Sequence, residues 1–148
     1  MGFTISQDCT GCRACARICP TRAISGDKKQ QHAIDTDACI ECGACGRVCP
    51  ARAVIDNFGL ALARVPKKDW ERPWFDLDTC MSCTICIEAC PAGVLSLVLQ
   101  KVGSPHKFPF LENEAGCIAC GFCALDCPVD AVAMGARQVA PAPAKAKA

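Results

Sequence analysis

The chain has 148 residues, and 16 of them, about 11%, are cysteine. Leucine, isoleucine, valine and phenylalanine together number only 32, so a hydrophobic core alone cannot offset the conformational entropy lost on folding. The length excludes a large enzyme with its own substrate cleft, and with a formal net charge of +1 we expect no nucleic-acid partner.

The cysteines are expected to lie in a reducing compartment. The first eight residues, MGFTISQD, have neither the basic start nor the apolar run of a secretory signal, and the longest apolar stretch, 94–99, is too short to span a bilayer. We therefore expect a soluble, cytoplasmic protein with no membrane span. Cysteine in such a compartment usually binds metal.

Four segments share the pattern C-x2-C-x2-C-x3-C-P, and together they contain all 16 cysteines. They begin at Cys9, Cys39, Cys80 and Cys117. Their spacing groups them in twos, because the starts within each pair are 30 and 37 residues apart and 41 residues separate the pairs. We predict two modules, 1–57 and 75–136, with a linker at 58–74 and an extended Ala/Pro/Lys tail at 137–148.

Short elements are predicted around each segment. Apolar and acidic residues alternate at 34–37, 75–78 and 110–112, which indicates short strands before three of the four segments. The residues between the third and fourth cysteines fit one helical turn, and the following proline redirects the chain. Each module is therefore predicted to be α+β, with the order strand, cysteine loop, short helix and strand occurring twice.

The spacing of the cysteines points to metal clusters. On a regular helix, cysteines at i, i+3 and i+6 would diverge by about 60° and climb about 4.5 Å at each step, so they could not converge. A loop wrapped around a cluster can present all three, and small residues such as Gly11, Ala14, Gly43 and Ala44 leave room for that wrap. Disulfides and structural zinc are the weaker alternatives, because neither explains the triple spacing.

The four segments resemble those of the bacterial-type two-cluster ferredoxins, here duplicated in tandem. The resemblance implies two ferredoxin-like βαββαβ modules with four [4Fe–4S] clusters, in which the fourth cysteine of one segment ligates the cluster of the other. Seven extra residues between the third and fourth segments depart from the pattern. The implied ligand sets are Cys9, Cys12, Cys15 and Cys49; Cys39, Cys42, Cys45 and Cys19; Cys80, Cys83, Cys86 and Cys127; and Cys117, Cys120, Cys123 and Cys90.

The ligand count indicates electron transfer rather than catalysis. Four such clusters need 16 thiolates and the chain has 16, so no iron is left open for a substrate and no catalytic residue is predicted. No nucleotide-binding or nucleophile motif occurs. His32 and His106 are isolated in the sequence and are expected to face solvent. One-electron relay is the activity that remains.

The expected partner is a catalytic oxidoreductase subunit. Trp70, Trp74 and Phe75 lie near the basic linker and suit a permanent interface, although both tryptophans could instead cover the junction between the modules. By size and cluster count, the chain looks most like the electron-transfer subunit of bacterial tungsten-dependent aldehyde oxidoreductases. Hydrogenases, formate dehydrogenases and 2-oxoacid oxidoreductases are other candidate partners. The alternative is a freely diffusing polyferredoxin.

Charge is distributed unevenly along the chain. Residues 1–74 carry a net charge of +3, residues 75–136 carry −5 and the tail carries +3. If each cluster with its thiolates adds about −2, the whole chain carries about −7. The excess of arginine around the first two segments predicts higher reduction potentials in the first module. The opposite signs also make further copies of the chain, joined head to tail, a possible partner.

Overall fold

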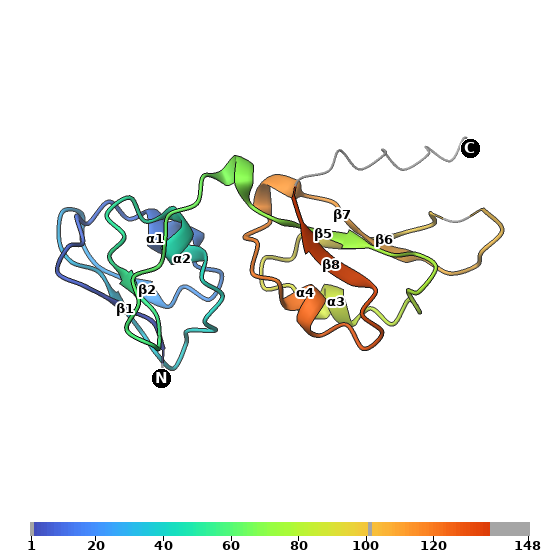
Figure 1. Ribbon diagram of the computed structural model, residues 1–148, viewed down its shortest axis with the longest axis horizontal. Helices are drawn as coiled ribbons and strands as arrows, with labels where there is room; N and C mark the ends of the chain where they lie inside the picture. The colour runs from blue at the N-terminus through green and yellow to red at the C-terminus, as the bar shows by residue number, and fades with distance from the viewer. Residues whose placement is uncertain (1, 101, 137–148) are drawn as a thin grey trace. The chain divides into compact units, whose positions relative to one another are not determined.

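The computed structural model describes residues 2–100 and 102–136 (Figure 1). The predicted tail at 137–148 lies outside these residues. The chain divides into two compact units, one ending at Trp70 and the other beginning at Glu71. Both are small α+β units, and each is described by itself below.

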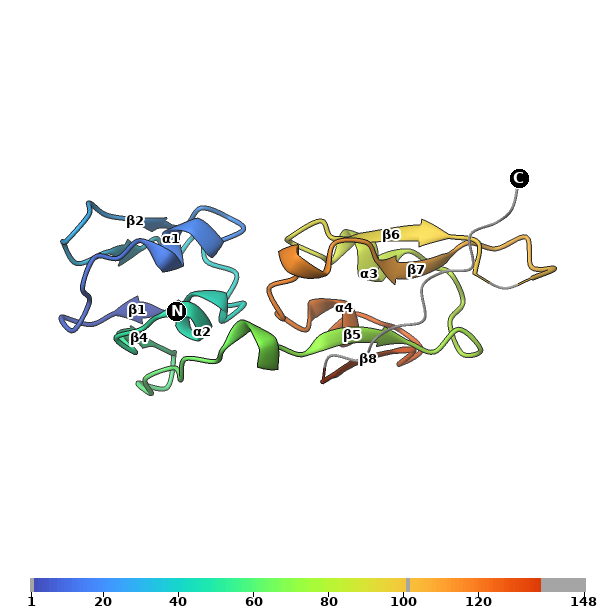
Figure 2. The same ribbon diagram turned by 90° about the horizontal axis from the view of Figure 1, so that it is seen from above.

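The first unit consists of short strands and helices that follow the cysteine segments closely. The strands form two antiparallel pairs, in which Thr4 of β1 lies opposite Ile55 of β4 and Ile24 of β2 lies opposite Ile34 of β3 (Figure 2). Both helices begin one residue before the third cysteine of a segment and end one residue before the fourth. The elements are β1 (Thr4–Ile5), α1 (Ala14–Ile18), β2 (Ile24–Ser25), β3 (Ala33–Ile34), α2 (Ala44–Val48), β4 (Val54–Ile55) and the 3-10 helix η1 (Lys67–Asp69).

The segment after β4 packs back onto the first unit. The amide of Leu62 donates a hydrogen bond to the carbonyl of Val54 at 2.8 Å, and the amide of Val65 donates to the carbonyl of Arg47 at 3.0 Å. Gly46 of α2 allows this close approach, because a Cβ there would lie 2.4 Å from the Cβ of Leu62. Trp70 is buried, and its indole N–H donates to the carbonyl of Val65 at 2.8 Å.

The second unit repeats the same order of elements with longer strands. Arg72 of β5 lies opposite Gly135 of β8, and Leu95 of β6 lies opposite Leu111 of β7, again as two antiparallel pairs (Figure 2). The elements are β5 (Arg72–Phe75), α3 (Ile85–Glu88), β6 (Leu95–Val98), β7 (Phe108–Leu111), the 3-10 helix η2 (Glu114–Gly116), α4 (Phe122–Leu125) and β8 (Val132–Gly135).

The extra residues of the second unit extend its hairpin. Each strand of the β6–β7 pair has four residues, whereas each strand of the β2–β3 pair has two. Of the other three extra residues, two lengthen the loop between β6 and β7 and one lies in the segment that contains η2. The insertion therefore leaves the order of elements unchanged.

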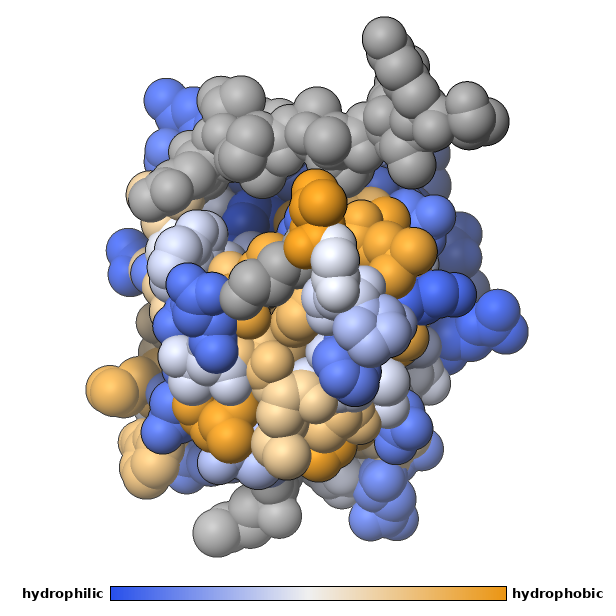
Figure 3. Space-filling model, turned by 90° about the vertical axis from the view of Figure 1, so that its right-hand side faces the viewer, coloured by the Kyte–Doolittle hydropathy of each residue, from blue (hydrophilic) through white to orange (hydrophobic). Residues whose placement is uncertain are grey.

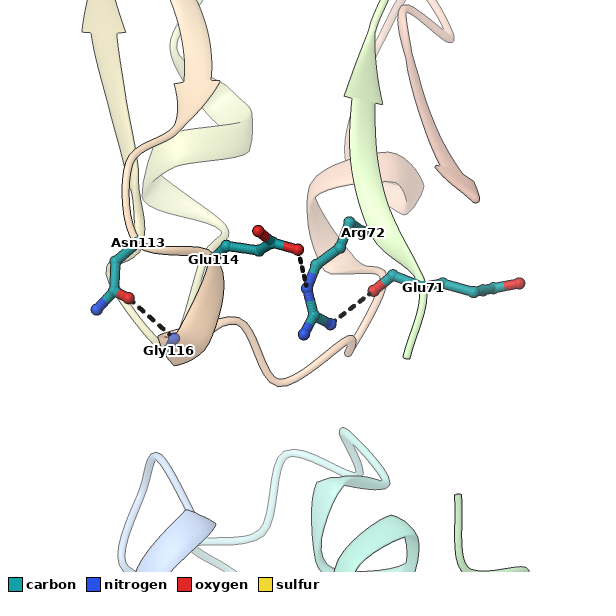
Figure 4. A network of polar contacts seen from close by, with 5 residues as sticks. All are labelled: Glu71, Arg72, Asn113, Glu114 and Gly116. Atoms are coloured by element: carbon teal, nitrogen blue, oxygen red, sulfur yellow. Dashed lines mark hydrogen bonds and ion pairs between the residues drawn. The ribbon is translucent and has the colours of Figure 1, made fainter. Parts of the chain in front are cut away.

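A polar network in the second unit links β5 to η2 (Figure 4). The Nε of Arg72 lies 3.9 Å from Oε1 of Glu114, and an η nitrogen of the same guanidinium donates to the carbonyl of Glu71 at 3.1 Å. Asn113 caps η2, because its side-chain oxygen accepts the amide hydrogen of Gly116 at 3.1 Å. These contacts fix the chain just before the fourth cysteine segment.

The hydrophobic cores of the two units are small and rich in cysteine. The first is formed by buried residues that include Phe3, Ile24 and Val54 together with three cysteines. The second contains only Leu95, Val132 and two cysteines as buried members. Cores of this size contribute little stability by themselves, so the cysteines and what they bind must supply much of it.

Apolar side chains also remain on the surface. The space-filling view shows apolar patches among hydrophilic residues (Figure 3). Exposed apolar residues of the second unit include Trp74, Leu99 and Val102. Among the described residues, no helix has the length and apolar character needed to cross a membrane.

Candidate metal centres

The four cysteine loops share one backbone conformation. In each loop, the residue before the second cysteine and the residue after it both have positive φ angles, between 54° and 81°. Left-handed residues next to right-handed ones turn successive amide N–H groups toward one side, and such concave nests bind anionic groups, iron–sulfur clusters among them. The pairs of residues are Gly11 and Arg13, Glu41 and Gly43, Ser82 and Thr84, and Ala119 and Gly121.

This conformation corrects the role that the sequence suggested for the small residues. Ala14 and Ala44 lie at the starts of α1 and α2 rather than in the wrap. The positions that need positive φ hold glycine in only three of eight cases. At position 11 there is also no room for a side chain, because a Cβ on Gly11 would lie 2.4 Å from the amide nitrogen of Gln30. The requirement is therefore mainly one of backbone angle rather than of bulk.

A further left-handed residue follows each Cys-Pro step. It lies three residues after the fourth cysteine, at Arg22, Arg52, Gly93 and Asp130. In two of the four segments the turn brings the next amide back to the cysteine sulfur. The amide of Ala53 donates to Sγ of Cys49 at 3.3 Å, and the amide of Ala131 donates to Sγ of Cys127 at 3.2 Å. Such N–H···S bonds stabilise a thiolate.

The structure brings the 16 thiols together in four groups, each lining one cavity. Every cavity encloses about 310–320 Å³, including the part that opens to solvent, and is lined by three cysteines of one segment and the fourth cysteine of its neighbour. The groups are Cys9, Cys12, Cys15 and Cys49; Cys19, Cys39, Cys42 and Cys45; Cys80, Cys83, Cys86 and Cys127; and Cys90, Cys117, Cys120 and Cys123. We name them cavities 1 to 4 in this order.

The thiols are crowded and partly withdrawn from water, which opposes their ionisation. Burial, with the nearby thiols of Cys42, Cys39 and Cys15, raises the pKa of Cys45 to about 12. Burial and the thiols of Cys120, Cys117 and Cys90 do the same for Cys123. The pKa values of Cys15, Cys86 and Cys120 are also raised, with burial the largest cause. A cationic metal centre among these sulfurs reverses the balance and holds them as thiolates.

The donor set fits an iron–sulfur cluster. Thiolates are the ligands of [4Fe–4S] clusters, and each contacts its own iron, so the four sulfurs surround a volume rather than converge on a point. Among the described residues, no group of three or more His, Cys, Asp or Glu side chains is arranged to hold a single metal ion. The amide of Gly11 donates to Sγ of Cys9 at 3.4 Å, which adds a second N–H···S bond to cavity 1.

Positive side chains lie close to the first two cysteine segments. Arg13 lines cavity 1. The guanidinium of Arg47 donates a hydrogen bond to the carbonyl of Cys42 at 3.1 Å. These two arginines are placed to offset negative charge at the clusters of the first unit.

The expectation that His32 faces solvent was wrong, whereas His106 is exposed as expected. His32 is only 2% exposed, because its ring packs over Gly26 next to cavity 1, which it lines. Sequence reasoning missed it because an isolated histidine in a polar loop carries no periodic signal. The one available signal is Gly26, whose φ of 149° and missing side chain create the space for the ring.

Comparison with known proteins supports the iron–sulfur interpretation. Models of the 4Fe-4S dicluster domain match residues 8–53, residues 79–132 and, across the two units, residues 35–94. No curated protein matches. The chain is therefore a protein of multiple [4Fe–4S] clusters, built from 4Fe–4S dicluster domains of the ferredoxin type, and these domains support a role in electron transfer.

One similar solved structure is a chain of the formate dehydrogenase–heterodisulfide reductase–formylmethanofuran dehydrogenase complex from Methanospirillum hungatei. The sequence identity is 22% and the TM-score is 0.44. The alignment covers 94% of the present chain and 54% of the other, so the present chain spans about half of the length of that protein.

Proposed function

We propose that the chain is a non-catalytic electron-transfer subunit that relays single electrons through four [4Fe–4S] clusters. The observation that carries the proposal is the grouping of all 16 cysteines into four sets of four around four cavities. With every thiol committed to a set, no cluster has an iron site left open to bind a substrate. The chain would therefore conduct electrons to and from a partner.

The proposal includes the ligand sets and the module fold. Each cluster takes three thiolates from one segment and one from the neighbouring segment of the same unit, in the groups that line cavities 1 to 4. This crossed pairing ties the two halves of a βαββαβ ferredoxin-like module together, and the order of elements in both units supports it. Cross-links of this kind explain how units with such small cores stay folded.

The side chains and amides have separate tasks in the relay. When bound, [4Fe–4S] clusters supply reversible one-electron chemistry. The thiolates hold the clusters in place, and the amides of Gly11, Ala53 and Ala131 donate to ligand sulfurs and so stabilise added negative charge. Buried apolar residues such as Val54 and Val132 limit the access of water.

The partner that we propose is a catalytic oxidoreductase, with a tungsten-dependent aldehyde oxidoreductase as the specific candidate. Trp74 is 55% exposed and lies two residues from Arg72, an arrangement suited to a protein interface. The resemblance in size and cluster count supports the specific candidate, and we place the complex in the cytoplasm. A freely diffusing carrier is the second possibility, and a second copy of the chain is a further possible partner.

The test is the composition of anaerobically purified protein. We expect about sixteen iron and sixteen acid-labile sulfide per chain, and uptake of about four electrons in a reductive titration. Iron near eight, or zinc in its place, would contradict the four-cluster proposal. Purification from the native source then separates the two roles, because a subunit stays with its catalytic partner at high salt, whereas a diffusing carrier elutes alone.

A further inference from the structure

Cavity 1 contains a polar side chain that the cluster ligands do not account for. His32 is 2% exposed and is, with Val54, one of the two largest fully buried side chains among the described residues. Its Nε2 is buried and has no hydrogen-bond partner among those residues. An unsatisfied buried nitrogen is costly, so its retention beside a cavity calls for a partner that occupies the cavity.

The ring has a defined orientation. Its Nδ1 lies 3.1 Å from the carbonyl oxygen of Gln30, and because a carbonyl only accepts, Nδ1 carries the hydrogen. The edge that bears Cγ and Nδ1 rests on Gly26, where a Cβ would lie 2.7 Å from Cγ and 3.0 Å from Nδ1. Nε2 is not among the ring atoms that meet Gly26, and His32 is one of the residues that line cavity 1.

The loop that carries His32 is also fixed against the cysteine loop. The amide of Lys29 donates to the carbonyl of Gly11 at 3.1 Å, and the side-chain amide of Gln31 donates to the carbonyl of Ile5 at 2.7 Å. These bonds on both sides of Gln30 hold the loop to β1 and to the first cysteine segment. The position of His32 relative to cavity 1 is therefore part of the fold of this unit.

We propose that His32 donates a hydrogen bond from Nε2 to the cluster held by Cys9, Cys12, Cys15 and Cys49. The inference rests on the proposed ligand set. Those four thiolates already supply one ligand for each iron, so the group that His32 meets is a cluster or thiolate sulfur, which accepts. In this arrangement both ring nitrogens donate, Nδ1 to the carbonyl of Gln30 and Nε2 to a sulfur in cavity 1.

The second unit lacks this group, which makes it an internal reference. His32 lies two residues before Ile34, the partner of Ile24 in the β2–β3 pair. Pro109 lies two residues before Leu111, the partner of Leu95 in the β6–β7 pair. Pro109 is buried and lines cavity 3, so a side chain with no donor takes the place of His32. The chain thus carries one donor-equipped cavity and one without a donor at the same position.

The expected consequence is a raised reduction potential at one cluster. A hydrogen-bond donor stabilises the reduced cluster, which is the more negative state. In H32F, which keeps a ring but has no N–H, we expect the potential of one cluster to fall by about 59 mV or more, a tenfold change in the ratio of reduced to oxidised cluster. The control is H106Q, which changes the exposed histidine of the second unit and should leave all four potentials unchanged.

A second measurement uses the intact His32. In H106Q protein, His32 is the only histidine, so ¹⁵N-histidine labelling marks one ring. We expect electron–nuclear double resonance of the reduced protein to show a weak ¹⁵N coupling, as a hydrogen bond gives. A strong coupling would mean direct ligation to iron, and no coupling would mean no contact. Either result overturns the proposal.

The two measurements also separate this inference from the proposed ligand set. If H106Q protein contains about sixteen iron per chain but shows no ¹⁵N coupling, the inference about His32 fails while the four-cluster proposal stands. Unchanged potentials in fully loaded H32F lead to the same conclusion. If H32F cannot hold its iron, the labelling measurement decides, because that protein keeps His32.

Discussion

The crossed pairing of the cysteines can be tested by combining substitutions in pairs. Cys9 and Cys49 line cavity 1, although they belong to different segments, whereas Cys19 of the first segment lines cavity 2. Replacing Cys9 and Cys49 together should therefore damage one cluster. Replacing Cys9 and Cys19 together should damage two, although both residues come from one segment.

The expected magnitudes follow from the four groups of thiols. Each single variant, C9A, C19A or C49A, should keep about three intact [4Fe–4S] clusters per chain. C9A/C49A should also keep about three, because the second change acts on a cluster that is already lost, and this non-additivity marks two residues of one site. C9A/C19A should keep about two. In the second unit, C80A/C127A and C80A/C90A form the matched pair, with the same expected contrast.

The assay counts intact clusters rather than iron alone, since a damaged cluster can retain part of its iron. Mössbauer spectroscopy of ⁵⁷Fe-enriched protein gives the fraction of iron in [4Fe–4S] form, and iron analysis converts that fraction to clusters per chain. The result that refutes the crossed pairing is the reverse pattern, with two clusters lost in C9A/C49A and one in C9A/C19A. Equal losses in both double variants would refute it as well.

Three further predictions concern backbone angles and charge. T84G should stabilise the cluster-loaded second unit by roughly 0.5–1 kcal/mol, because a β-branched residue with a φ of 68° is strained. G121T, where a Cβ would meet only Met134 at 3.9 Å, should destabilise the same unit by a similar amount. The denaturant midpoints of both variants check this prediction, and a lower midpoint for T84G contradicts it. G26A should destabilise the first unit by about 1–3 kcal/mol, because the new Cβ would clash with the buried ring of His32. G59A is the control and should destabilise this unit less, because nothing lies within 4 Å of a Cβ at that position. Equal unfolding midpoints for the two variants would disprove the clash. R13Q should lower the potential of the cluster in cavity 1, more at low salt than at high salt, and a redox titration showing no change would remove the charge argument.

The sequence predicted the helices and the strands that follow each Cys-Pro step because cysteine spacing and proline act locally. Each α-helix begins one residue before the third cysteine of its segment and ends before the fourth. The aliphatic pair after Cys-Pro supplies strand residues such as Ile24 and Val54. The strands predicted before three of the cysteine segments, at 34–37, 75–78 and 110–112, lie too far toward the C-terminus compared with β3, β5 and β7. Asp35 and Asp76 lie beyond the ends of β3 and β5, where the side-chain oxygens of both accept the amide hydrogen of the residue two positions on. Alternation of apolar and acidic residues there reflects a turn.

The left-handed residues could not be predicted from residue type. Glycine marks such positions when it is present, but Thr84 and Glu41 also have positive φ angles, as Gly43 does. Local preference opposes this conformation in a β-branched residue by about 1–2 kcal/mol, so the loop must be stabilised by what it encloses. Only the alignment of the four segments shows that Thr84 occupies the position of Gly43 and Gly121. These positive-φ positions are therefore identified by the alignment of the repeated segments and not by the backbone propensity of the residue types.

The burial of His32 depends on a contact between residues that are six positions apart in a hairpin loop. Histidine in a polar loop is usually solvated, and nothing in the residues next to it indicates otherwise. Gly26 leaves the space, and the bond from Lys29 to Gly11 brings the loop to the first cysteine segment. Both contacts belong to the tertiary structure of the first unit. Either residue considered alone therefore leads to the wrong prediction that His32 is exposed to solvent. The Gly26–His32 pair is therefore a more specific marker of a donor-equipped cluster than the histidine alone, and a related chain with alanine at the glycine position should lack the donor even where it keeps the histidine.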